Sequence, residues 1–116
     1  MNKFIVSGVF LALVLILSAC SRVPIDQTKP TFFYSDSCPH CQKVEEFMTE
    51  NQVRDNYPLY EKNTKTDREA AKLFLEVVAE CGLDKGEFGV PLLYESGQCY
   101  MGDVLIINHF KEKLGL

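Results

Sequence analysis

The segment FFYSDSCPHCQKVEEFM, residues 32–48, places two cysteines between stretches of different periodicity. Before them, Thr31–Tyr34 is a short run dominated by aromatic side chains, which is typical of a strand buried on both faces. After them, an apolar residue recurs at every third or fourth position, as on one face of a helix. Pro39 suits the first position of that helix, where a missing N–H does no harm. The segment therefore predicts a strand, a turn, and a helix that begins with Cys38 and Cys41.

The sequence after this segment divides into further short elements. A capping box at Thr66–Glu69 opens the most regular helix, and Ser96-Gly97 is a hairpin turn. The further elements expected are strands at 57–62, 91–95 and 98–101, and helices at 66–81 and from 103 onward. The order is strand, helix, strand, helix, strand, strand, helix, in which the first half is a parallel βαβ unit. We therefore predict an α/β protein with a four-stranded mixed sheet and three helices.

The N-terminus has the features of a targeting signal. Lys3 gives a short positive region, and residues 4–17 form an apolar stretch shorter than the ~20 residues of a comfortable membrane span. Small residues and then Cys20 follow, which resembles the lipobox of bacterial lipoproteins; an uncleaved signal anchor or a plain secretory peptide is the alternative. The expected divisions are a lipoprotein signal peptide at 1–19, a tether at 20–30 with lipidated Cys20, and a domain at 31–116.

Charge and compartment narrow the function further. The net charge is −4 and no basic run occurs, which argues against a nucleic-acid partner. Export would place the chain outside the cytoplasm, where disulfides persist. Of the five cysteines, lipidation would remove one and leave four, an even number that suits pairing.

The spacing of Cys38 and Cys41 indicates disulfide chemistry. Residues i and i+3 at a helix start are close enough to form a disulfide. The free N–H groups and positive potential of a helix N-terminus stabilise an anion, so Cys38 is the expected nucleophilic thiolate and Cys41 the buried resolving thiol. Pro39 stiffens the turn, and His40 would bring a cation near the Cys38 sulfur, which favours the reduced form and makes the disulfide more oxidising.

The other two cysteines allow several interpretations. Cys81 ends the apolar stripe of the second helix, and Cys99 begins the last strand. If that helix runs antiparallel to the preceding strand, the two cysteines approach each other away from the first pair. A structural disulfide, a second redox relay and two free thiols all remain open. His109, near the apolar face of the last helix, is expected at the core boundary rather than as a ligand.

The order of elements resembles the thioredoxin-like superfamily, and in length and topology a glutaredoxin. Two motifs carry the resemblance: Cys38-Pro39-His40-Cys41 at a helix start, and Gly89-Val90-Pro91 before a strand. The resemblance implies that Pro91 is cis and lies against the two cysteines, and that Val90 and Pro91 contact the substrate. Gly102-Asp103 also looks like the glutaredoxin segment before the final helix.

The Pro-His dipeptide between the cysteines is the DsbA pattern, and the following residues, including Glu45, continue it. That match makes Glu45 a candidate for tuning the buried cysteine, although a solvated helix face is the simpler interpretation. The large helical insertion of DsbA is absent, because only about forty residues separate the first helix from Pro91. Ser35 stands where glutaredoxins usually carry a lysine, which makes glutathione use doubtful.

These observations predict a thiol–disulfide oxidoreductase that needs no cofactor and is lipid-anchored in the cell envelope, outside the cytoplasm. It would exchange disulfides with thiol-containing protein clients through Cys38 and Cys41, with oxidation as the favoured direction. The resemblance implies a membrane redox partner, either an oxidase of the DsbB or vitamin-K-epoxide-reductase type or a reducing carrier. The alternatives are a reductase for cytochrome or copper-site assembly, a non-catalytic Cu(I)-binding lipoprotein, a zinc site and a purely structural disulfide.

Overall fold

The computed structural model describes residues 24–116, so the expected signal peptide and lipidated Cys20 lie outside the described residues. The elements are β1 (Thr31–Tyr34), α2 (Pro39–Glu50), α3 (Val53–Asn56), β2 (Tyr60–Asn63), α4 (Arg68–Glu80), the 3-10 helix η1 (Leu83–Lys85), β3 (Leu92–Glu95), β4 (Gln98–Met101) and α5 (Asp103–Leu114). Their order follows the predicted alternation, with α3 and η1 added.

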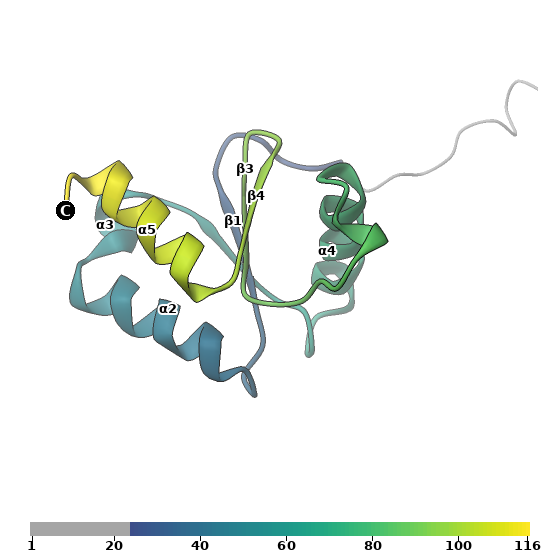
Figure 1. Cartoon of the computed structure of the whole chain (residues 1–116), viewed down its shortest axis with the longest axis horizontal. Coiled ribbons are helices and arrows are strands. Elements are labelled where there is room, and N and C mark those ends of the chain that lie inside the picture. The colour runs from purple at the N-terminus through teal and green to yellow at the C-terminus, as the bar shows by residue number, and fades with distance from the viewer. Residues whose placement is uncertain (1–23) are drawn as a thin grey trace, which may run out of the picture.

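The four strands form one mixed sheet in the order β2-β1-β3-β4. β1 pairs in parallel with β2 and antiparallel with β3, and β3 and β4 form an antiparallel hairpin. Figure 1 shows α2, α3 and α5 on one side of this sheet and α4 on the other. The fold is therefore a three-layer arrangement in which the central strands β1 and β3 are covered on both faces.

Each face of the sheet carries its own hydrophobic core. Phe32 belongs to the cluster formed with α2, α3 and α5, whereas its neighbour Phe33 belongs to the cluster formed with α4. Both side chains are fully buried, because successive residues of a strand point to opposite faces. This double burial explains the uninterrupted aromatic run in β1, and it fixes the strand from which the chain turns into the first cysteine.

The prediction of three helices was wrong, because the described residues contain a fourth, α3. Residues 51–56 are polar apart from Val53, so they carry no helical period. Val53 is nonetheless fully buried in the core beneath α2 and α5. Arg54 also forms a two-pronged ion pair with Glu61, with donor–acceptor distances of 2.8 and 3.0 Å. One apolar anchor and one ion pair therefore hold a turn of helix that periodicity could not reveal.

Two smaller expectations were also wrong. The N-cap of α4 is Asp67 rather than Thr66, because the Asp67 carboxylate accepts from the backbone N–H groups of the first turn. Pro58 precedes β2 instead of lying in the strand expected at 57–62, and β2 is an edge strand of the sheet. In α5, Ile106 and Phe110 are buried, whereas Leu105 is 55% exposed.

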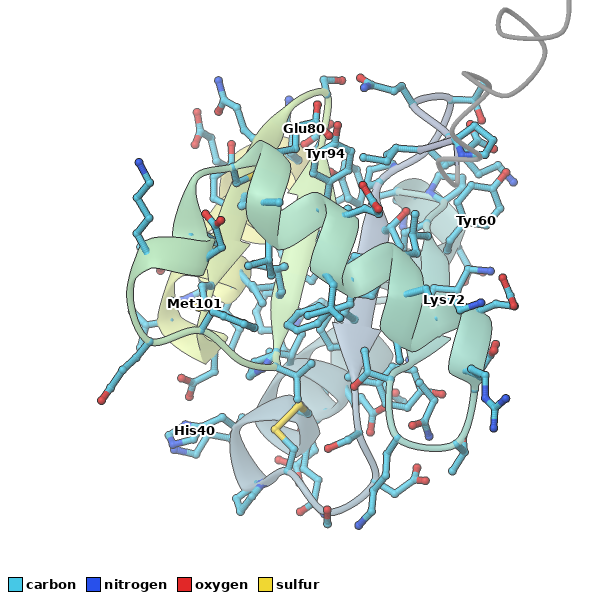
Figure 2. All side chains as sticks on the ribbon, turned by 90° about the vertical axis from the view of Figure 1, so that its right-hand side faces the viewer. His40, Tyr60, Lys72, Glu80, Tyr94 and Met101 are labelled. Carbon is cyan, nitrogen blue, oxygen red and sulfur yellow. A yellow bond between two sulfur atoms is a disulfide. The ribbon has the colours of Figure 1, made fainter. Side chains whose placement is uncertain are left out.

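The segment before β1 is bound to the fold. Ile25 packs against the core cluster beneath α4, the hydroxyl of Tyr60 donates to Asp26 at 2.8 Å, and the Gln27 amide donates to the hydroxyl of Tyr94 at 3.0 Å. Figure 2 shows Tyr94 at the end of the molecule opposite His40. The described part of the expected tether is therefore held at that opposite end.

Candidate active site

The first two cysteines of the described region form a disulfide at the N-terminus of α2. Cys38 is the N-cap, in an extended conformation, and Cys41 lies in the first helical turn, with the Cα atoms 5.2 Å apart. The backbone N–H of Cys41 donates to Cys38 Sγ at 3.1 Å. After reduction, the same N–H would face the Cys38 sulfur, and an N–H donor at a helix start favours a thiolate over a thiol.

The two sulfurs differ in their access to solvent. Cys41 is 1% exposed and belongs to the core, whereas Cys38 is partly exposed. Cys38 Sγ lies 3.6 Å from the carbonyl oxygen of Val90, and the Val90–Pro91 peptide is cis with Pro91 buried. The structure therefore brings the Cys-Pro-His-Cys and Gly-Val-Pro motifs together, with the more accessible sulfur at their junction.

A groove of about 570 Å³ runs beside this junction. Its lining includes His40, Phe88, Val90, Pro91 and Asp103. Phe88 is 40% exposed and gives the groove an apolar wall.

His40 contacts a residue that the sequence analysis did not assign to the site. Its Nδ1 lies 3.2 Å from Oδ1 of Asp103, and the Lys43 ammonium lies 3.7 Å from the other carboxylate oxygen. Desolvation acts to raise the pKa of Asp103, but its hydrogen bond and charge interaction with His40, together with the charge of Lys43, outweigh desolvation and lower that pKa. The Gly102-Asp103 dipeptide was the only signal in the sequence, and it indicated a helix start rather than a partner for His40.

Glu45 follows Cys41 by one helical turn, so the two side chains share a face of α2. Desolvation is the main cause that raises the pKa of Glu45, followed by repulsion from Glu61. Burial likewise raises the pKa of Tyr34, and repulsion from Glu45 is the next largest cause. A carboxyl group with a raised pKa beside the buried cysteine is suited to holding a proton there.

The second cysteine pair lies elsewhere in the fold. Cys81, the C-cap of α4, forms a disulfide with Cys99 of the edge strand β4, with Cα atoms 6.1 Å apart. His109 is buried, and its Nε2 is hydrogen-bonded to Glu95 rather than to any group named for the first pair. Within residues 24–116, no three potential metal-binding side chains converge. No helix of this same region is long and apolar enough to cross a membrane.

The sequence matches no model of a known protein family, and no curated protein matches it. The mixed four-stranded sheet, the helices that cover it and the pair at CXXC spacing are consistent with a thioredoxin-like fold. The disulfide at the helix N-terminus is compatible with a redox function.

Proposed function

We propose that this protein is a thiol–disulfide oxidoreductase that exchanges disulfides with protein clients through Cys38 and Cys41, and that oxidation of clients is its favoured direction. The observation that carries the proposal is the unequal environment of the two sulfurs. Cys38 is partly exposed, caps α2 and accepts the N–H of Cys41, while Cys41 is buried. This asymmetry suits a nucleophile and a resolving thiol better than two equivalent metal ligands or an inert staple.

The exchange proceeds in two balanced steps. A client thiolate attacks Cys38 Sγ, a client–Cys38 disulfide forms, and the Cys38–Cys41 bond breaks with the electron pair leaving on Cys41 as a thiolate that takes up a proton. A second client thiolate then attacks the client sulfur of that mixed disulfide, and Cys38 leaves as a thiolate. The client loses two electrons and the protein gains them, so the helix N-terminus, which stabilises the Cys38 thiolate, favours this direction.

The groove suggests how a client is held. Phe88 gives it an apolar wall, and Val90 and Pro91 form the side nearest Cys38. An unfolded or loosely folded client exposes the apolar segments that such a wall can bind. We therefore take thiol-containing polypeptides, rather than small thiols, as the substrate class.

A lipid on Cys20 would anchor the protein in the cell envelope, outside the cytoplasm. The contacts of Asp26 with Tyr60 and of Gln27 with Tyr94 support one orientation, since they lie at the end of the fold opposite His40 (Figure 2). The disulfide would then face away from the anchored end. Clients in the aqueous compartment reach it directly, whereas a membrane oxidase or reducing carrier must extend a domain to it.

The test uses the oxidised protein and a reduced two-cysteine peptide. Cys38→Ala should abolish peptide oxidation, a loss of at least ~10³-fold, because no sulfur remains for the incoming thiolate. Cys41→Ala, offered the oxidised peptide, should instead accumulate a mixed disulfide that mass spectrometry assigns to Cys38. Absence of a Cys38 adduct in Cys41→Ala together with an adduct on Cys41 in Cys38→Ala, or peptide oxidation by Cys38→Ala at the wild-type rate, would overturn the proposal.

The reduction potential then decides the direction. A value near −120 mV is that of a strong oxidant such as DsbA, and one near −270 mV is that of a reductant such as thioredoxin. We expect a value nearer the first. Titration of the reduced protein with Cu(I) separates the carrier alternative: tight binding without peptide oxidation would favour it over the exchange described here.

A further inference from the structure

Asp103 is placed beside the redox pair by a short, well-fixed connection. It is the first residue of α5, and it follows Gly102, whose φ of 95° is one that glycine adopts without strain. The Gly102 backbone N–H donates to the carbonyl oxygen of Pro91 at 3.0 Å. The start of α5 is therefore tied to the cis Val90–Pro91 segment, whose Val90 carbonyl contacts Cys38, and Asp103 has little freedom to move away.

The contact between Asp103 and His40 is unequal. The Asp103 side chain is 16% exposed and is held from both sides by His40 and Lys43, whereas the His40 side chain is 64% exposed. The carboxylate is therefore the fixed partner, and the imidazole is the group whose direction it determines. In the oxidised protein, His40 is directed toward this carboxylate.

We infer that Asp103 is a positioning residue that holds His40 toward α5 and so restrains the oxidising power of the Cys38–Cys41 pair. The inference rests on the proposed exchange function. Reduction creates an anion at Cys38, and an imidazolium free to approach that sulfur would stabilise it. Asp103 competes with the thiolate for the imidazolium and adds a negative charge of its own. Both effects disfavour the reduced form and make the disulfide a weaker oxidant.

Three charged side chains lie near His40. Asp103 and Lys43 contact each other and contribute opposite charges, and Glu87 lines the same groove as His40. Among residues 24–116, Asp103 is the only one that forms an ion pair or hydrogen bond with the imidazole. Replacing Asp103 therefore changes both the local charge and the direction of His40, and a second variant must separate the two.

The experiment equilibrates the full protein with reduced and oxidised glutathione and follows the thiolate absorbance of Cys38 against pH. Asp103→Asn should shift the equilibrium toward the reduced protein by about fivefold to tenfold, where tenfold corresponds to ~30 mV, and should lower the Cys38 pKa. In a His40→Ala background the same substitution should shift the equilibrium less than about twofold, since only its direct charge effect remains. Glu46→Gln, an equal change in net charge on α2, serves as the matched control.

The possible outcomes distinguish the positioning role of Asp103 from the proposed exchange function. An equal shift in both backgrounds, or a shift toward the oxidised protein, would overturn the positioning role while leaving the exchange function intact. A shift no larger than that of Glu46→Gln would overturn it as well. If the wild-type pair does not equilibrate with any thiol, the proposed function itself fails, which the Asp103→Asn result alone could not indicate.

Discussion

The two disulfides of this fold differ in the length of chain that they enclose and in their surroundings. Cys38 and Cys41 are three positions apart on one helix start, whereas Cys81 and Cys99 are 18 positions apart and join a helix to an edge strand. The first borders a groove and the cis Val90–Pro91 peptide; the second fastens the end of α4 to the rim of the sheet.

The number of residues between the two cysteines indicates how much stability the fold loses when each disulfide opens. A bridge within one helical turn removes little freedom from the unfolded chain, because its partners are already neighbours in sequence. A bridge that closes a long loop removes much more, about 3 kcal/mol for a loop of some 15 residues. Opening the first disulfide is therefore expected to cost the fold much less stability than opening the second.

The largest effect expected from this comparison is on stability. Replacing both Cys81 and Cys99 with Ala should lower the free energy of unfolding by ~3 kcal/mol, since the loop between them is no longer closed. Peptide oxidation by the Cys38–Cys41 pair should change less than twofold at a temperature where the variant stays folded. Urea unfolding monitored by circular dichroism measures the first quantity, and the peptide assay measures the second.

The opposite result would contradict a structural role for the second disulfide. A variant that keeps its stability but loses peptide oxidation would make Cys81 and Cys99 a second redox relay rather than a brace. The matched experiment reduces only the Cys38–Cys41 bond with a mild thiol. It should move the urea midpoint much less than removal of the second bond does.

Local segments of this fold are predicted from the sequence better than contacts between distant segments. The strand–turn–helix around Cys38 is local, and its aromatic run, its proline and its apolar stripe all indicate the same structure. Asp103 was missed as a partner of His40 because the two are 63 positions apart and only the packing of α5 against α2 brings them together. Val53 was missed for a similar reason, since a single buried residue in a polar stretch has no period.

A second, smaller effect concerns the pair formed by buried His109 and partly buried Glu95. Burial acts to raise the pKa of Glu95, but hydrogen bonds from Tyr57 and His109, together with the charge of Lys113, lower it below its ordinary value. A depressed carboxyl pKa adds stability that is fully present above the unfolded pKa, near 4.5, and is lost as the pH falls through the folded value.

Glu95→Gln should therefore destabilise the fold by about 1–2 kcal/mol at pH 7, and the difference from wild type should close as the pH falls toward 3. Urea unfolding at several pH values measures it. A gap that widens in acid would mean that Glu95 is not held ionised by these neighbours. The reduction potential should not change, because this pair is not in contact with the first disulfide.

The smallest effect tests where α4 begins, the helix that carries Cys81 at its far end. Asp67→Ala should cost about 1 kcal/mol, because its carboxylate accepts from the backbone N–H groups of Glu69 and Ala70 at 3.0 and 3.3 Å. Thr66→Ala, the cap that the sequence alone predicts, should stay within ~0.5 kcal/mol of wild type, as an ordinary surface substitution does. If the two variants lost equal free energy of unfolding, Thr66 would contribute to the N-cap as the sequence predicts. Neither variant should alter peptide oxidation, since α4 covers the face of the sheet opposite α2. A changed oxidation rate would mean that the start of α4 is coupled to the first disulfide.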